Sequence, residues 1–528
     1  MRKVLFGIVL LVSLNFSFIL SAFPNHLKNN SFCELSRKIQ IEKSTETPID
    51  STQILSFYAK YPKLILYKNQ VEELYQKNDF HYIWFDQKGK KEIAEVLYNK
   101  INNLAEEGVL VSVPYKNEWE TLYLNEASNI SIEEELFLST YYFFYTNKVI
   151  QGLANDKITE MEWFLPRKKI CYPDYIDSLL ISPKLFDKKN QQIDQYYKLK
   201  DKLLKYREIE KNGGWNPIII PLDFKPIKPG DNLTIVKEIR TRLYITGDIT
   251  EDNSSPFYDK ALQKGVLHYK KRNGFSLDKT ILAKHIHEMN VPVSERIKTI
   301  MVNMERCRWV PSDLLKNDEL IAVNIPSFSL SYYKKNKKVL ESEVVVGTTM
   351  NKTVIFSGMM SNIVFSPYWN VPSSIVQKEI LPALKKNENY LTEKNMEWYD
   401  GGIRQKPGPN NALGLVKFIF PNSNNIYLHD TPSKSLFKEE NRAFSHGCIR
   451  VAKPVELANA ILENDRNWTP QKIITAMDSG KELWYALKNK IPVYIGYFTA
   501  WVDENDAICF YKDIYDRDNR LYDVLVEK

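Results

Sequence analysis

Glycine is scarce in this 528-residue chain, and its 19 glycines argue against repeat solenoids and Gly-rich nucleotide-binding folds. The 72 Lys and Arg exceed the 65 Asp and Glu by only seven, too few to indicate nucleic-acid binding as the main role. The sequence has no internal period and no low-complexity tract. Its hydrophobic fraction of 44% is ordinary for a globular protein, and the length suggests about three to four domains.

The first 23 residues are expected to lie outside the fold. Arg2-Lys3 precedes an almost wholly apolar run, Val4 to Leu20, and Ser21-Ala22 offers small residues near a cleavage position. This pattern is typical of a secretory signal. The alternative is an uncleaved membrane anchor, because the run approaches the ~20 residues that span a bilayer. No cysteine follows directly, which argues against a lipoprotein, and either interpretation predicts export.

Export makes the cysteine count informative. An odd number of cysteines in an exported chain leaves at least one thiol free or paired between chains. Such a thiol is either an inert buried side chain or a nucleophile kept out of disulfides. The five cysteines are Cys33, Cys171, Cys307, Cys448 and Cys509. The four other than Cys448 can form up to two disulfide bridges, or none.

The hydrophobic pattern changes from helical to strand-like along the chain. It is helical from about residue 34 to 207, and prolines and glycines mark Asn212–Gly230 as an extended connection. Three further helices are expected between residues 236 and 306, the last with Ser294 as its N-cap. Strand-like runs follow from Leu320 onward. The order of helices and then strands predicts a multidomain α+β protein.

Two later segments have more specific patterns. Lys417–Phe420 and Ile426–Leu428 flank Pro, Asn and Ser residues and are predicted to form a hairpin. Residues 373–414 interrupt the strands with a helix and a Gly/Pro/Asn-rich tail. A long insertion of this kind is either a lid over a site or a surface elaboration.

One segment, residues 429–451, carries the chemistry. It reads HDTPSKSLFKEENRAFSHGCIRV and holds His429, His446 and Cys448. A cysteine nucleophile needs an imidazole to take its proton, and spacing alone does not decide which histidine does so. Gly447 lets the backbone approach a substrate, so the Cys448 N–H, with that of Gly447 or His446, is expected to form an oxyanion hole.

The whole string resembles the L,D-transpeptidases of bacterial cell-wall synthesis. Their signature is a histidine, a spacer of about fifteen residues, and Ser/Thr-His-Gly-Cys, which His429 and Ser445-His446-Gly447-Cys448 match. Tyr368-Trp-Asn-Val-Pro372 and Lys406-Pro-Gly-Pro409 are similar to the larger periplasmic members with a capping insertion. The resemblance assigns Cys448 as nucleophile and His429 as base and later acid, oriented by the Asp430 carbonyl, with His446 lining the site.

The resemblance also implies a domain order. After the signal or anchor it comprises a helical scaffold domain (34–230), a peptidoglycan-binding-like domain (231–291), a catalytic domain (309–502) with a capping lid (373–414), and a C-terminal extension (503–528). The small domain has Lys279 after Asp278 where relatives usually carry Asp-Gly, so a glycan-binding and a purely structural role both stay open.

Three flanking residues have two interpretations each. Arg450 either binds a substrate carboxylate or forms a structural ion pair. Tyr368 and Trp369 either wall the cleft for the acyl donor or pack in a core. His285 and His287 point apart on a helix, and we expect no metal or other cofactor.

The activity implied is cross-linking of peptidoglycan stems through a Cys448 thioester. D-Alanine leaves, two diamino acids become joined, and carbapenems acylate the same thiol. The donor and acceptor partners are tetrapeptide stems, the location is the periplasm or cell envelope, and the process is cell-wall biogenesis and cell shape. The alternatives are an L,D-carboxypeptidase or related hydrolase of the same fold, and a non-catalytic wall-binding scaffold.

Overall fold

The computed structural model describes residues 49–124, 131–167, 172–187, 191–312, 314 and 317–526. The predictions for the N-terminal apolar segment, Cys33 and Cys171 lie outside these ranges. The described residues form two compact units. The first comprises residues 49–98, 115–124, 131–143 and 172–187, and the second comprises 99–114, 144–167 and the described residues from 191 onward.

The first unit is mainly helical and is held by aromatic packing. The rings of Phe57, Tyr61 and Phe137 meet at centroid distances of 4.6 to 5.0 Å. Its elements, two of which continue into the second unit, are α1 (Ser51–Lys60), η2 (Pro62–Tyr67), α2 (Lys68–Lys77), β1 (Phe85–Asp86), β2 (Gly89–Lys90), α3 (Glu92–Asn102), α4 (Lys116–Tyr123), α5 (Ile132–Tyr145), α7 (Tyr172–Ile181) and η5 (Pro183–Asp187).

The second unit begins with further helices, which include the three predicted between residues 236 and 306. They are η3 (Leu104–Glu107), η4 (Thr146–Gln151), α6 (Asn155–Glu160), α8 (Asp194–Lys211), α9 (Thr234–Thr246), α10 (Lys260–Arg272), α11 (Ala283–Met289) and α12 (Val293–Trp309). The prediction that Ser294 is an N-cap is wrong. Helix α12 begins one residue earlier, because Pro292 with φ −57° and ψ 149° already turns the chain into the helix.

A closed ring of strands forms the centre of the second unit. The ring order is β11-β12-β14-β6-β5-β4-β15-β7, and β7 also pairs with β11. Strand β3 (Trp163–Phe164) runs parallel to β7, and β13 (Ala443–Ser445) pairs with β6. The ring strands are β4 (Glu319–Asn324), β5 (Ser329–Lys334), β6 (Lys337–Gly347), β7 (Ile355–Phe365), β11 (Val416–Ile419), β12 (Leu428–His429), β14 (Ile449–Val451) and β15 (Leu483–Gly496).

The predicted hairpin is confirmed. Strands β11 and β12 pair antiparallel, and the Asn422 side chain organises the turn by accepting from the N–H groups of Asn424 and Ile426. Alternate side chains of these strands, such as Phe418 and Leu428, lie in the core. The side chains that alternate with these core residues along each strand therefore face the other side of the sheet.

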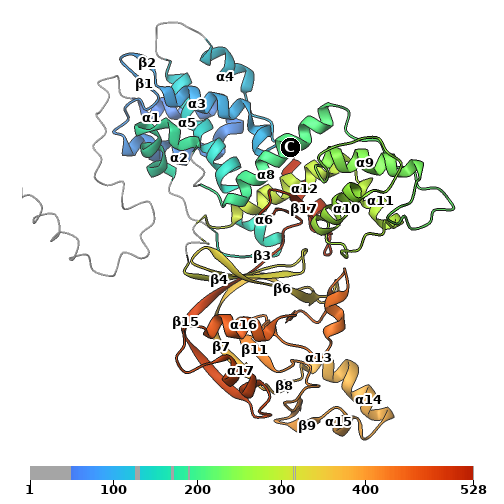
Figure 1. Cartoon of the computed structure of the whole chain (residues 1–528). Coiled ribbons are helices and arrows are strands. Elements are labelled where there is room, and N and C mark those ends of the chain that lie inside the picture. Colours follow the sequence, from blue (N-terminus) through green and yellow to red (C-terminus); the bar gives the residue numbers. More distant parts are fainter. Residues whose placement is uncertain are drawn as a thin grey trace, which may run out of the picture. The chain divides into compact units, whose positions relative to one another are not determined.

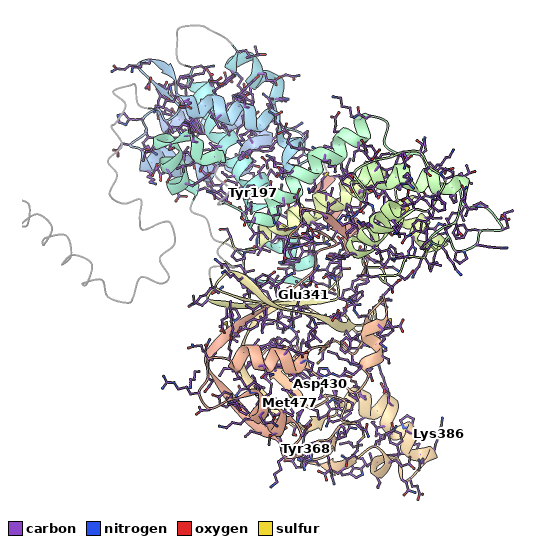
Figure 2. All side chains as sticks on the ribbon, in the orientation of Figure 1. Tyr197, Glu341, Tyr368, Lys386, Asp430 and Met477 are labelled. Carbon is purple, nitrogen blue, oxygen red and sulfur yellow. The ribbon has the colours of Figure 1, made fainter. Side chains whose placement is uncertain are left out.

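The insertion after β7 has a small core of its own, made by Val371, Ile375, Ile380 and Ile403. It begins with the expected helix, but it also contains a three-stranded sheet, β8-β10-β9, that the sequence pattern did not indicate. Figure 1 shows these elements as one group, and Figure 2 places Lys386 at its outer end. They are β8 (Trp369–Asn370), α13 (Ser373–Ile375), η7 (Val376–Ile380), α14 (Leu381–Lys386), α15 (Tyr390–Glu393), β9 (Met396–Tyr399) and β10 (Gly402–Gln405).

The remaining elements complete the second unit. They are η8 (Lys434–Lys438), α16 (Pro454–Leu462), α17 (Pro470–Met477), β16 (Ala500–Val502), β17 (Ile508–Phe510) and α18 (Asp518–Val526). Helical segments followed by a strand-rich region confirm the predicted multidomain α+β class. No helix in the described ranges is long and apolar enough to cross a membrane.

Candidate active site

The register of three strands brings the candidate residues onto one face. His429 on β12 lies opposite Lys417 on β11 and opposite Arg450 on the parallel strand β14. Because side chains alternate, these three share the face that the core residues leave free. Cys448 precedes β14, and the N–H of the following residue donates to the Tyr427 carbonyl. Tyr427 and Cys448 therefore form the next row on the same face.

The protonation of the His429 ring follows from its contact with Asp430. Nδ1 lies 2.5 Å from the Asp430 carbonyl oxygen, which can only accept, so Nδ1 carries the proton and Nε2 is free to take another. Burial, followed by Arg450, lowers the pKa of His429 to about 3, and Lys417 acts in the same direction. The imidazole is therefore a neutral base at neutral pH.

Cys448 is the most exposed residue among the three cysteines of the described residues. Cys307 and Cys509 are buried, whereas Cys448 is partly exposed. Its sulfur lies 3.6 Å from the Asn425 carbonyl oxygen. Burial raises the pKa of the Cys448 thiol, and Tyr427, Lys417 and Arg450 oppose that rise. All three of these side chains stabilise the thiolate.

Two cations on this face are not neutralised by an ion pair. Among the described residues no carboxylate lies within ion-pair distance of Lys417 or Arg450, although Glu482 acts on Lys417 from farther away. The buried Nε of Arg450 has no hydrogen-bond partner in the same part of the chain. The Lys417 Nζ instead lies over the rings of Tyr427 and Trp484, at 5.4 and 5.6 Å from their centroids. Such an arrangement favours anions, including a thiolate, an oxyanion or a substrate carboxylate.

The loop before Cys448 is fixed by backbone geometry. Gly447 has φ +114°, a conformation that favours glycine. Its N–H donates to the Ser445 hydroxyl at 3.1 Å, and that hydroxyl donates to the Cys448 carbonyl at 2.5 Å. The Gly447 amide is thus already in use. Within the described part of the chain, the Cys448 N–H has no hydrogen-bond acceptor and is available to an oxyanion.

The two histidines of the motif have different surroundings. His446 is about half exposed, and its Nε2 lies 3.3 Å from Glu379 in the insertion. His429 is buried on the strand beside that of Cys448. This difference supports His429 as the base and leaves His446 at the contact between the motif and the insertion.

The side chain of Asp430 ties the end of the insertion to the strand that carries His429. One carboxylate oxygen accepts from the Leu415 N–H at 2.9 Å, and the other pairs with Lys434. Gly414 has φ +61°, and a Cβ there would lie only 2.3 Å from this carboxylate. Figure 2 labels Asp430 within the strand region. Asp430 therefore contributes a side chain as well as the predicted carbonyl.

Tyr368 and Trp369 lie at the start of the insertion. The Tyr368 N–H donates to Glu482, and its ring stacks on the Arg404 guanidinium at 4.1 Å. Trp369 packs against the small core of the insertion. Their contacts are therefore with the insertion and β15 side of the molecule, and their role toward a substrate stays a prediction.

His285 and His287 point apart, as expected for neighbours on helix α11. His285 is buried and accepts the Leu282 N–H at 2.9 Å, whereas His287 is exposed. Lys417 and Tyr427, by contrast, are site residues that the sequence analysis missed. A lysine within an otherwise apolar strand, and a tyrosine two residues before His429, were the available signals.

Comparison with known proteins identifies the two domains. Residues 318–476 match the YkuD family, described as an L,D-transpeptidase catalytic domain, and residues 69–203 match a family described as a scaffold domain. A curated protein of Haemophilus influenzae named "Putative L,D-transpeptidase" is 35% identical over 257 residues, which are 44% of this chain and 51% of that protein. The chain thus spans about half the length of this relative.

Solved structures similar to part of the chain include two L,D-transpeptidases. One is from Mycobacterium smegmatis (10% identity, 34% of this chain and 58% of that chain, TM-score 0.20), and one is from Stackebrandtia nassauensis (13%, 53% and 97%, TM-score 0.21). The family matches confirm the resemblance drawn from the motif: the chain carries an L,D-transpeptidase catalytic domain preceded by a scaffold domain.

Proposed function

We propose that this protein is an exported L,D-transpeptidase that cross-links peptidoglycan stems through a thioester on Cys448. The observation that carries the proposal is that His429 on β12 and Cys448, directly before the neighbouring strand β14, lie on one face, with Nε2 of the imidazole unprotonated. A neutral base next to a thiol is the arrangement that nucleophilic acyl transfer needs.

The first half-reaction forms the acyl-enzyme. His429 Nε2 takes the thiol proton as the Cys448 sulfur attacks the carbonyl carbon of the third stem residue. The Cys448 N–H stabilises the oxyanion, and the nearby Lys417 and Arg450 favour the negative charge. The C–N bond to D-alanine then breaks, and the imidazolium gives its proton to the leaving amine.

The second half-reaction transfers the acyl group. The side-chain amine of a diamino acid on a neighbouring stem attacks the thioester, and His429 takes a proton from that amine. The C–S bond breaks, and the proton passes to the departing sulfur. Water in place of the amine gives an L,D-carboxypeptidase instead.

The insertion is proposed to act as a lid that disfavours water. Both of its ends lie near the site: Glu379 contacts His446, and Leu415 is held by Asp430. A cover of this kind biases the competition between amine and water. Residues 231–291 are proposed as the peptidoglycan-binding-like domain, and the N-terminal segment as the signal or anchor that directs the chain to the envelope.

The test is incubation of the purified full-length chain with disaccharide-tetrapeptides, followed by mass spectrometry. Dimers that have lost one D-alanine support transpeptidation, and tripeptide monomers alone indicate the hydrolase. Cys448→Ala should form neither, whereas Cys509→Ala, which removes another described thiol, should behave as wild type. No product from the wild type would leave only the non-catalytic scaffold, and product from Cys448→Ala would overturn the assignment of the nucleophile.

A further inference from the structure

The carbonyl of Gly447 accepts a hydrogen bond from a buried threonine. Thr353, in the connection between β6 and β7, donates its hydroxyl to this carbonyl at 2.8 Å. The same hydroxyl accepts the Gly347 N–H at 2.9 Å. Thr353 is fully buried, so water does not compete for either bond. Its hydroxyl therefore has a single orientation.

Tyr515 binds the main chain of this threonine and of Gly347. Its hydroxyl donates to the Gly347 carbonyl at 2.7 Å and accepts the Thr353 N–H at 3.1 Å. The Tyr515 N–H in turn donates to the Tyr497 hydroxyl at 2.9 Å. Tyr515 lies after the residues matched by the catalytic family, which end at 476. The C-terminal segment thus contacts the residue that holds the loop before Cys448.

The geometry of the peptide bond links this network to the Cys448 amide. The described residues contain no cis peptide bond, and in a trans peptide the C=O and the next N–H point in opposite directions. With the Gly447 carbonyl directed at Thr353, the Cys448 N–H must point away from Thr353. Gly447 has φ +114° and no Cβ, so its backbone has conformations open to it that other residues lack. A restraint from another part of the chain therefore helps to select one orientation of the Gly447–Cys448 peptide.

We propose that Thr353 and Tyr515 are positioning residues that orient the Gly447–Cys448 peptide, and with it the Cys448 N–H that stabilises the oxyanion. The inference rests on the proposed acyl transfer at Cys448. Neither residue touches the substrate. They act through Gly447 and Gly347, so their removal slows steps that develop an oxyanion and spares the reactivity of the sulfur itself.

The test compares two reactions of the same thiol. In acylation by imipenem, the thiol of the full-length chain attacks the β-lactam carbonyl, an oxyanion develops, and the C–N bond of the ring breaks. Alkylation by iodoacetamide develops no oxyanion. Thr353→Val removes the hydroxyl at nearly constant shape, and we expect acylation about tenfold to a hundredfold slower with alkylation unchanged. Thr353→Ser, which keeps the hydroxyl, should restore acylation.

Two further variants complete the design. Thr348→Val is the matched control in the same connection, because its hydroxyl accepts from Asn351, and both of its rates should equal those of wild type. Tyr515→Phe leaves the Thr353–Gly447 bond and should slow acylation several-fold. If Thr353→Val fails to fold, Tyr515→Phe decides the question by the same comparison of rates.

The outcomes separate this inference from the proposed function. If Thr353→Val is acylated at the wild-type rate, the positioning role alone is overturned. If Thr353→Val does not fold, a wild-type rate of acylation in Tyr515→Phe overturns it instead. Equal slowing of acylation and alkylation also overturns it, because the defect would then be general. A wild-type chain that imipenem does not acylate overturns the proposed function and this inference together.

Discussion

Two groups of charged residues in the second unit differ in how their charges are balanced. In the helical segment, Asp248 accepts from two nitrogens of Arg272, each at 2.6 Å, and from His268 at 2.8 Å. On the sheet face, Lys417 and Arg450 flank His429 without a carboxylate partner among the described residues. Loss of one partner from a balanced buried pair destabilises a fold, whereas cations without an ion-pair partner beside a thiol are available to stabilise a reacting anion.

The largest effect on turnover is expected from substitution of His429, the base that Lys417 and Arg450 flank. His429→Asn removes the proton acceptor while keeping a side chain of similar reach. Transpeptidation of disaccharide-tetrapeptides should fall by about 10² to 10⁴-fold, the usual contribution of general acid–base catalysis. His268→Gln, in the balanced group, should leave turnover unchanged. Equal losses in the two variants would contradict the contrast between the groups.

The converse prediction concerns the stability of the balanced group. Asp248→Asn leaves Arg272 buried without its charge partner, and the free energy of unfolding should fall by about 3–5 kcal/mol in urea denaturation. Glu251→Gln, at an exposed position of the same segment, serves as the control. Imipenem acylation per folded molecule should not change, and a large change would show that this group reaches the site.

Acid should weaken the same group. Burial by itself disfavours the Asp248 carboxylate, but Arg272 and the hydrogen bonds outweigh burial and lower the pKa to about 2. A carboxyl with a lowered pKa contributes stability that is present above its unfolded pKa of about 4 and is lost as the pH falls toward 2. Asp248→Asn should therefore reduce the dependence of unfolding on pH in that range.

The pH profile tests the state of the imidazole. With the pKa of His429 lowered to about 3, chiefly by burial and then by Arg450, the base is lost only near that pH. The imipenem acylation rate should be flat from about pH 5 to 8. In His429→Asn the free thiolate must attack alone, and the rate should rise about tenfold per pH unit. A wild-type acylation rate that falls with a midpoint near pH 6.5 would instead indicate that His429 has an unshifted pKa.

The two cations can be separated in the same His429→Asn background. Lys417→Met removes a charge that opposes the burial of the Cys448 thiolate, so the thiol pKa should rise further. At fixed pH we expect about threefold to tenfold less thiolate, measured by its ultraviolet absorbance. Arg450→Met should have the same sign and a smaller effect. Lys472→Met, on an exposed position of α17, should have none, and a fall in pKa with Lys417→Met would reverse the assignment.

The smallest effect is expected at the contact between lid and motif. Glu379 and His446 are both more than half exposed, and pairs of this kind contribute little. Glu379→Gln should shift the ratio of cross-linked dimer to hydrolysed tripeptide by less than about fivefold toward tripeptide. Glu388→Gln, at another exposed position of the insertion, is the control. A shift toward dimer would mean that the contact does not help exclude water.

The sequence predicted the parts of the site that lie close together along the chain. The apolar run that ends at His429 indicates a strand, and the Ser-His-Gly-Cys string ends at Cys448. The family matches confirm the fold class and the catalytic and scaffold domains inferred from these patterns. The roles of the individual residues stay predictions that the variants above address.

The parts that the sequence did not predict depend on distant pairings. Lys417 joins the site through the register of β11 with β12, which no local pattern specifies. Thr353 and Tyr515 are 162 residues apart in the chain. A hydrogen bond over that distance follows from the closed ring and the C-terminal segment, not from either residue's neighbours.

The length of β7 depends on pairing for a related reason. The polar run around Ser357 and Gly358 does not alternate, yet the strand is continuous from Ile355 to Phe365. Its pairing with β11 and β15 supplies the stability that local propensity lacks. The three-stranded sheet of the insertion likewise depends on the pairing of β8, β9 and β10.

The claim that Cys448 is the nucleophile has a direct measurement. The full-length chain is treated with imipenem, its intact mass is recorded, and the adduct is located by peptide mapping. We predict one adduct, on the peptide that contains Cys448, and none in Cys448→Ala. An adduct on another cysteine, or one that persists in Cys448→Ala, would contradict the account.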